Sequence, residues 1–239
     1  MIRGIYTAAV SMMARKTQQE IIANNLANVN TAGYKRDRMQ FRNTLDAKML
    51  INQNPQVTPV EGVQTDFSQG RLSKTDDLYD FALETPGFFV IEGPNGRYYT
   101  RNGHFTLTES GELVAANGIP VLGESGPITL PEGKFSVNAN GEIIVNNEVL
   151  NKFLVAQFQQ PAQALRKVGN NLYEARQGTA QPEMVDGRIR QGYLESSNVN
   201  VVEEMVDMIL AFRDFAANQK TIQTQDETLR RAVTDLGRV

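Results

Sequence analysis

The sequence predicts an α+β protein in which two terminal helices flank a central antiparallel β domain. Three observations predict this class: helical spacing of apolar residues at both chain ends, short β-branched and aromatic runs between them, and turn pairs that divide those runs. The length of 239 residues, 41% of them hydrophobic, suffices for one large or two modest domains. We divide the chain into an N-terminal helix (1–34), an extended connector (35–75), a mainly β domain (76–190) and a C-terminal helix (191–239).

The N-terminal segment predicts one amphipathic helix that ends near Asn28. Its apolar side chains recur three or four residues apart, with polar side chains between them. Gly33 follows in an Asn-rich turn and can adopt the left-handed conformation that closes a helix. The turn is either a plain C-cap or a cap whose amides also bond a neighbouring subunit.

The connector begins with a basic stretch and continues into a segment rich in Asn, Gln, Pro and Gly. Residues 35–38, together with Arg42, are expected to form a solvated charged face. From Asn52 to Gly70 the composition favours extended chain with short strands over helix.

The central part of the chain predicts antiparallel strands joined by tight turns. Asn-Gly tolerates positive φ at both central positions of a hairpin turn, which matches the twist of paired strands. Such turn pairs occur at Asn95-Gly96, Asn102-Gly103, Ser110-Gly111, Asn117-Gly118 and Asn140-Gly141. The clearest strands are residues 98–100, 104–107 and 153–156.

The C-terminal segment predicts a second, longer helix. Neither Gly nor Pro interrupts Val201 to Leu236, and Asn200 is the predicted N-cap, with Glu203 completing a capping-box pattern. At a rise of about 1.5 Å per residue this helix is roughly 50 Å long. It is longer than the β domain can cover.

The apolar stripes of the two helices exceed what two helices bury against each other, so neighbouring subunits are the expected cover. The N-terminal helix is expected to pack on part of the C-terminal one as a coiled-coil-like pair, with the helices inside an assembly and the β domain outside. The residues predicted to make subunit contacts are Ile5, Ala9, Met12, Ile22, Asn25, Leu26, Asn28, Val202, Met205, Val206, Ile209, Phe212, Ala216, Ile222, Leu229 and Val233.

Composition excludes most catalytic and metal chemistry. The chain has no cysteine, no tryptophan and one histidine, His104, which rules out disulfides, thiol nucleophiles and multi-histidine metal sites. His104 with Glu109 is a poor catalytic pair because His104 lies in a strand pattern directly after a turn. Glu203 and Glu204 are adjacent on a helix, so their carboxylates diverge. We predict no enzymatic activity, no catalytic residue, no metal and no cofactor.

The charge balance also limits the partners. Lys and Arg total 24 against 27 Asp and Glu, a net charge of −3, which favours neither nucleic acid nor an anionic membrane surface. No window holds the roughly 18 uninterrupted apolar residues that a membrane-spanning helix needs. The sequence therefore predicts no membrane insertion, and partners recognised by shape and apolar contact.

Two long segments resemble the signatures of bacterial flagellar rod and hook proteins. Residues 21–35, IIANNLANVNTAGYK, are similar to the N-terminal signature, and residues 192–206, GYLESSNVNVVEEMV, to the second signature. Further family-like segments lie at 70–73, 80–83, 99–105 and 111–114. Within the family, segments 118–128 and 130–133 are most similar to the proximal rod protein, with the distal rod protein as the runner-up.

The resemblance implies a structural subunit of the flagellar basal-body rod, the drive shaft that carries motor torque across the cell envelope to the hook. It implies export through the flagellar type III apparatus. Its partners would be adjacent proximal and distal rod subunits, copies of itself and that export apparatus. A distal rod or hook-type subunit, or a secreted oligomeric adhesin that uses the β domain for recognition, stays open as an alternative.

Overall fold

The computed structural model describes residues 2–41, 60–94, 96–115, 118–131, 135–179 and 181–236. The chain forms two compact units, each drawn from segments that are distant in the sequence. Unit 1 takes residues 1–27, 37–65 and 199–239, and unit 2 takes residues 28–36 and 66–198. The terminal helices flank a central antiparallel β region in sequence order, which confirms the predicted α+β class.

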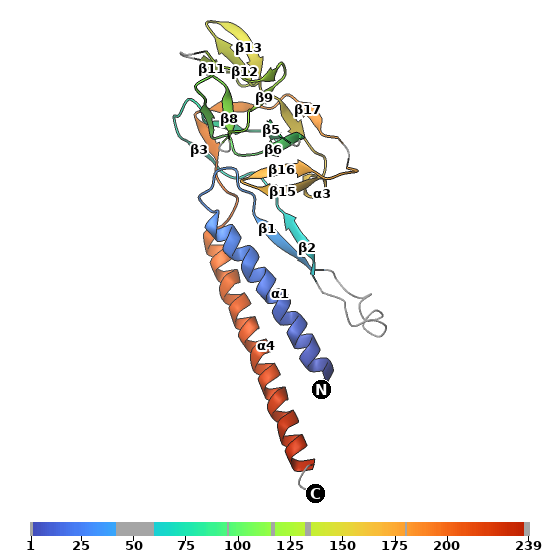
Figure 1. Cartoon of the computed structure of the whole chain (residues 1–239). Coiled ribbons are helices and arrows are strands. Elements are labelled where there is room, and N and C mark those ends of the chain that lie inside the picture. Colours follow the sequence, from blue (N-terminus) through green and yellow to red (C-terminus); the bar gives the residue numbers. More distant parts are fainter. Residues whose placement is uncertain are drawn as a thin grey trace. The chain divides into compact units, whose positions relative to one another are not determined.

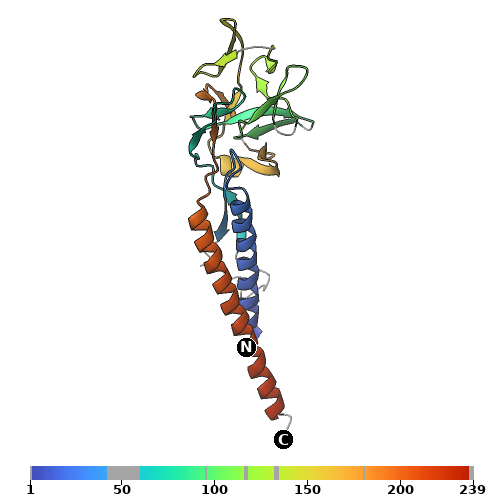
Figure 2. The same ribbon diagram turned by 90° about the vertical axis from the view of Figure 1, so that its left-hand side faces the viewer.

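Unit 1 is built on two helices. Helices α1 (Ile2–Ala27) and α4 (Val201–Leu236) lie side by side and run in opposite directions (Figures 1 and 2). Helix α1 ends one residue before the predicted end, and α4 has the predicted limits. The Asn200 side chain accepts hydrogen bonds from the backbone N–H of Val202 at 3.1 Å and of Glu203 at 3.5 Å, at the start of α4.

Unit 1 also contains an antiparallel ribbon. Strand β1 (Asp37–Phe41) pairs with β2 (Val60–Thr65), and Asp37 lies opposite Thr65. Of the predicted extended segment, residues 52–59 lie outside the described residues, as does Arg42. The described remainder contains β2.

Unit 2 contains a six-stranded antiparallel sheet with the order β15-β16-β6-β5-β14-β17. Its central hairpin pairs Val90 with Tyr99, and Val155 of the next strand lies opposite Phe89. The strands are β5 (Phe88–Gly93), β6 (Gly96–Thr100), β14 (Val155–Gln157), β15 (Leu165–Gly169), β16 (Leu172–Ala175) and β17 (Glu183–Val185). A short helix, α3 (Pro161–Ala164), precedes β15.

Unit 2 also contains short antiparallel strand pairs and a small three-stranded sheet. Two of these pairs join chain from before the sheet to chain from after it: β3 (Leu72–Lys74) with β19 (Tyr193–Glu195), and β4 (Phe81–Leu83) with β18 (Ile189–Gln191). The local pairs are β7 (Phe105–Leu107) with β8 (Leu113–Ala115), and β9 (Leu122–Gly123) with β10 (Gly126–Pro127). Strands β11 (Phe135–Val137), β12 (Glu142–Val145) and β13 (Glu148–Lys152) form a three-stranded sheet.

Two apolar clusters hold unit 2 together, and β5 contributes to both. Successive side chains of a strand point to opposite faces of its sheet. Phe89 and Ile91 therefore join the larger cluster, whereas Phe88 and Val90 join the smaller one. Phe89 packs edge-to-face on Phe105 with ring centroids 5.3 Å apart. Residues 88–91 of β5 are all apolar and buried, and such a segment is typical of a strand buried on both faces.

The turn pairs behave as predicted where they join paired strands. Gly111 (φ +81°) and Gly141 (φ +79°) lie in the turns of β7–β8 and β11–β12, as predicted. The hairpin predicted at Asn102-Gly103 is wrong, because β6 pairs with β5 and β16 and leaves no free edge for β7. Asn95 and Asn117 lie outside the described residues.

Two further hairpin turns carry no glycine in the turn pair. Asn146 and Asn147 join β12 to β13 with φ of +50° and +70°, and Asn170 and Asn171 join β15 to β16 with φ of +49° and +59°. Asparagine is among the few residues that tolerate this left-handed region. Sequence reasoning missed both turns, although the Asn-Asn pair at each was an available signal.

Candidate functional site

The interface between α1 and α4 in unit 1 is lined largely by small and polar side chains. Arg15 pairs with Asp214 at 2.7 Å, and the Asn25 amide donates to the Glu204 carboxylate at 3.2 Å. These two contacts fix the antiparallel register of the helices. Among the apolar residues buried on the helices are Ala8, Ile22 and Ala211.

Asn25 joins three elements of unit 1. Besides its bond to Glu204 on α4, it exchanges two hydrogen bonds with the backbone of Asp37 on β1, both at 2.9 Å. Its side chain is buried, so the amide serves contacts within the chain.

The residues predicted to contact other subunits divide into two sets by exposure. Ile22 and Asn25 are buried, and Ile5, Ala9, Met12, Leu26, Asn28, Ile222 and Leu229 are half-buried. The exposed residues are Val202, Met205, Val206, Ile209, Phe212, Ala216 and Val233. Most predicted contact residues of α4 therefore lie away from α1.

Five of the exposed residues form one apolar surface on the first three turns of α4. We call Val202, Met205, Val206, Ile209 and Phe212 the outer stripe. Val202 is 70% exposed and Phe212 is 57% exposed, although both are large apolar residues. Their spacing of three and four residues places them along one face of the helix. Helix α4 therefore presents a row of apolar side chains that α1 does not cover.

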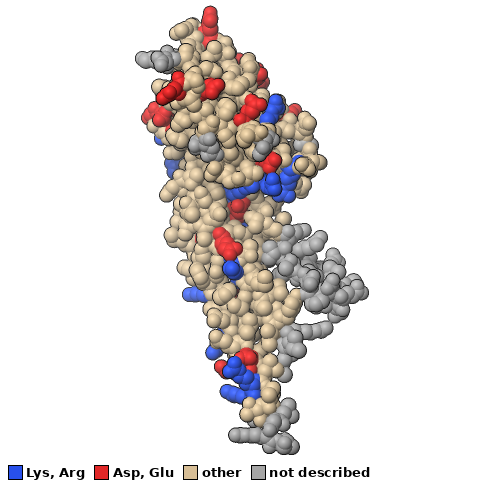
Figure 3. All heavy atoms as spheres, viewed as in Figure 1, with Lys and Arg blue, Asp and Glu red and all other residues tan. Residues whose placement is uncertain are grey.

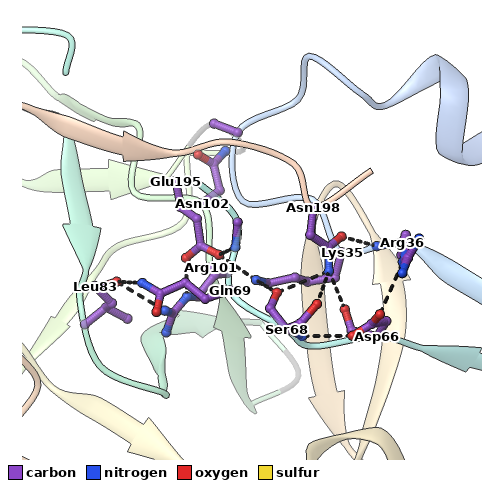
Figure 4. Close-up of polar contacts among 12 residues, drawn as sticks. Lys35, Arg36, Asp66, Ser68, Gln69, Leu83, Arg101, Asn102, Glu195 and Asn198 are labelled. Atoms are coloured by element: carbon purple, nitrogen blue, oxygen red, sulfur yellow. Dashed lines mark hydrogen bonds and ion pairs between the residues drawn. The ribbon is translucent and has the colours of Figure 1, made fainter. Parts of the chain in front are cut away.

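In unit 2, three charged side chains meet in a buried cluster (Figure 4). The Glu195 carboxylate accepts hydrogen bonds from Lys35 Nζ at 2.5 Å, Arg101 Nε at 2.5 Å and the Gly70 backbone N–H at 2.7 Å. The Lys35, Arg101 and Glu195 side chains are 2%, 4% and 1% exposed. The prediction of a solvated face is therefore wrong for Lys35, because its charge is paired with a carboxylate far away in the sequence.

The remaining donors of the two cations tie the cluster to surrounding loops. Arg101 donates to the backbone carbonyls of Leu83, Thr85 and Gly87. Lys35 Nζ donates to the Ser68 carbonyl at 2.7 Å. Burial lowers the pKa of Lys35 from its ordinary value, although Glu195 acts in the opposite direction. The cluster thus binds the segments around residues 35, 68, 85 and 195 to one another.

Gly33 lets the chain reach this cluster. Its φ is +68°, and its N–H donates to the Glu195 carbonyl at 2.7 Å. A Cβ at this position would lie 2.4 Å from the backbone nitrogen of Asn102. The predicted turn role of Gly33 is therefore enforced both by φ and by close backbone approach.

Asn198 forms a second polar group beside the cluster (Figure 4). Its amide accepts from the Arg36 N–H at 2.8 Å and donates to the Asp66 carbonyl at 2.8 Å. Arg36 pairs with the Asp66 carboxylate at 3.2 Å. Burial alone would raise the pKa of Asp66, but hydrogen bonds from Ser68 and Arg36 outweigh it and hold that pKa below its ordinary value.

The polar contacts found for this cluster are structural. Glu195 is buried and its carboxylate bonds three groups of the chain. The two rejected catalytic candidates lie elsewhere. The His104 ring contacts Asp80 at 2.6 Å, a neighbour that sequence reasoning missed. Glu204 is buried against Asn25, whereas Glu203 is exposed. Within the described residues, no group of three or more His, Asp or Glu side chains is placed to hold a metal ion. No described helix is long and apolar enough to cross a membrane.

Sequence reasoning missed the cluster, although a signal was present. Lys35 closes the first signature-like segment, Glu195 lies within the second, and Arg101 lies in a third family-like segment. Charges of opposite sign inside otherwise apolar or amide-rich motifs were the available indication of a buried ion pair.

Three segments of the chain match known families. Residues 5–35 match the family described as flagella basal body rod protein, residues 82–145 the flagellar hook protein FlgE/F/G D1 domain, and residues 190–235 the flagellar basal body rod FlgEFG protein C-terminal. The chain is 36% identical to the flagellar basal-body rod protein FlgG of Borreliella burgdorferi, over 96% of this chain and 97% of the relative. It is 32% identical to the flagellar basal-body rod protein FlgF of Caulobacter vibrioides, over the whole of both chains.

A third relative is the flagellar hook-basal body complex protein FlhO of Bacillus subtilis, 29% identical over the whole of both chains. These similarities span the terminal helices and the β region alike. They confirm the resemblance found in the sequence and the prediction that the chain is not an enzyme. The chain belongs to the flagellar basal-body rod protein family, and it is a structural rod subunit of the flagellar basal body that interacts with other rod and hook components.

Proposed function

We propose that the chain is a subunit of the proximal rod that assembles through its terminal helices and transmits torque from the motor to the hook. The outer stripe of α4 carries this proposal, because it exposes five large apolar side chains that α1 does not cover. Full burial of a side chain such as Ile209 or Phe212 contributes about 1.5 to 3 kcal/mol. Repeated across the interfaces of neighbouring subunits, these contacts make assembly cooperative while a dilute monomer associates little.

The buried cluster supports the torque-bearing role. It holds the segments that follow α1 and precede α4 against the β region of unit 2 with charge-assisted hydrogen bonds, which are stronger than neutral ones. Close-packed interiors of this kind transmit strain. In the assembly, we propose that α1 and α4 pack as a coiled-coil-like axial core, with 1–34 and 191–239 as core segments, 35–75 as connector and 76–190 as outer domain.

We further propose that the chain reaches its site through the flagellar type III export apparatus. The signature-like segments at both ends of the chain support this proposal, because they resemble exported rod and hook proteins. Segments 118–128 and 130–133 support the proximal position. Relatives named FlgG and FlgF are both found, so a distal rod or hook-type position is the second candidate.

The experiment that tests this proposal measures copy number and position in purified basal bodies. An epitope inserted at Gly178, an exposed position in unit 2, marks the chain for gold labelling and quantification. The proposal predicts a few copies at one fixed level at the motor end of the rod. Label at the hook end supports the second candidate, and label on the cell surface without rod incorporation supports an adhesin and contradicts the proposal.

A further inference from the structure

Unit 2 contains a cavity of about 240 Å³ beside the buried cluster. Lys35 and Arg101 both line this cavity, whereas Glu195, which pairs with both of them, does not. Among the described residues that line the cavity, none is acidic. The cavity therefore meets the two positive charges of the cluster without the carboxylate that pairs with them. We call it the cationic cavity.

The positive charge beside the cationic cavity is not fully balanced. Lys35 and Arg101 share the single carboxylate of Glu195, and the neighbouring pair of Arg36 and Asp66 is neutral as a whole, which leaves an excess of one positive charge. A buried charge without a counter-charge is costly, because the protein interior solvates it poorly. Burial accordingly lowers the pKa of Lys35 despite the opposing effect of Glu195. A bound anion would offset this cost.

Both cations keep a hydrogen-bond donor for such an anion. An ammonium group has three N–H donors and a guanidinium has five. Lys35 Nζ donates to Glu195 and to the Ser68 carbonyl, and Arg101 donates to Glu195 and to three backbone carbonyls. Within the part of the chain that the structure describes, each cation therefore has one more N–H than acceptors. A carboxylate has two oxygens and can accept from both.

The rest of the cationic cavity suits an apolar ligand body. Phe67, Phe88 and Phe158 line it, and the Phe67 and Phe88 rings pack edge-to-face with centroids 5.5 Å apart. Gln157 also lines the cavity and is exposed, whereas the two cations are buried. An apolar cavity of about 150 Å³ is large enough to bind benzene. The cationic cavity therefore has room for one ring and a carboxylate.

The surface of unit 2 does not attract anions in general. Figure 3 shows acidic side chains spread over the visible face of the β region. A broad positive surface would attract inorganic ions without regard to their shape. Here the excess positive charge is buried beside one cavity, so we expect selection for anions that fit the cavity.

We infer that the cationic cavity binds a small organic carboxylate with an apolar body of about one ring, for which benzoate is a probe. The carboxylate accepts hydrogen bonds from Lys35 and Arg101, and the ring packs among the three phenylalanines. A ligand that binds only the folded chain also stabilises it against unfolding. This site goes beyond rod assembly and does not depend on it.

Isothermal titration calorimetry of the full-length chain, at neutral pH and constant ionic strength, tests the inference. Benzoate is compared with benzamide, a neutral ligand of nearly the same shape, and with inorganic phosphate, an anion without a ring. The expected affinity for benzoate exceeds that for either control by at least about tenfold, because only benzoate gains both the charge-assisted hydrogen bonds and the apolar contacts. Equal affinity for benzamide contradicts the role of the cations, and equal affinity for phosphate contradicts the role of the rings. Absence of benzoate binding overturns the inference.

A second measurement locates the bound benzoate. Gln157→Glu adds a carboxylate at the cationic cavity and keeps the length of the side chain, so we expect it to weaken benzoate binding by about tenfold through charge repulsion. Gln223→Glu, at an exposed position of α4 in unit 1, makes the same charge change away from the cavity and is expected to leave the affinity unchanged. Equal affinities of the two variants would place the ligand elsewhere and contradict the inference. Rod assembly and motility are separate measurements, so failure of the cavity leaves the proposed function standing.

Discussion

Glu195 is expected to be the most sensitive charged position of unit 2. The substitution Glu195→Gln keeps the shape of the side chain but leaves Lys35 and Arg101, which are 2% and 4% exposed, without their counter-charge. Removing one partner of a buried ion pair destabilises a protein by about 3 to 5 kcal/mol. With a urea dependence of about 2 kcal/mol per molar, the unfolding midpoint falls by about 2 M.

Urea unfolding of the full chain, followed by circular dichroism of the β signal, measures this change. Glu174→Gln is the matched control, since Glu174 pairs with Arg166 at 2.9 Å on side chains that are 41% and 65% exposed. Such surface pairs contribute about 0 to 1 kcal/mol. The reasoning is refuted if the two variants lose the same stability, because burial of the cluster would then carry no energetic weight.

The other predictions concern the unit boundary, the turn and the acid range. A chain that starts at Asn28 is expected to keep its β-type circular dichroism and its cooperative unfolding. A chain that starts at Asp37 is expected to lose cooperativity, because Gly33 to Arg36 belong to unit 2. Equal unfolding curves for the two chains would contradict a unit boundary between Ala27 and Asn28. Gly33→Ala is expected to destabilise the chain by more than about 1 kcal/mol relative to the control Gly178→Ala. Both positions have positive φ, but only a Cβ at Gly33 would lie within 4 Å of other backbone atoms. The denaturant midpoints of the two variants measure the difference. Because the pKa of Asp66 is lowered in the folded chain, the ionised Asp66 carboxylate stabilises the fold above its ordinary pKa, and this stabilisation is lost as the pH falls through the lowered value. Asp66→Asn therefore makes the free energy of unfolding less dependent on pH between pH values of about 2 and 5.

Local patterns predicted the elements whose causes are local. The limits of α4 follow from an Asn N-cap and an uninterrupted helical segment, and the start of the helix is held by the two hydrogen bonds to Asn200. The hairpins at Gly111 and Gly141 follow from the need for positive φ. At Asn102-Gly103 the same signal failed because the sheet, and not the turn, decides which strand β7 pairs with.

The buried cluster depends on contacts that local patterns do not contain. Lys35 lies among charged neighbours, which indicates a solvated face, but its partner Glu195 is 160 residues away. Arg101 follows a strand and gave no sign that its guanidinium would be covered by three backbone carbonyls. The helical spacing of α4 predicted an apolar stripe, but only the register with α1 shows which residues α1 leaves exposed.

Assembly through the outer stripe is tested most directly by counting Phe212→Asp chains in purified basal bodies. Gln223→Asp is the matched control, an exposed position on the polar part of the same helix. We predict that the Phe212→Asp chain keeps the β-type circular dichroism of the wild type and is made at the wild-type level, yet is absent from rods, and that the cells are non-motile, while Gln223→Asp cells form normal rods. Motile Phe212→Asp cells with a full complement of the chain in their rods would contradict the proposed assembly.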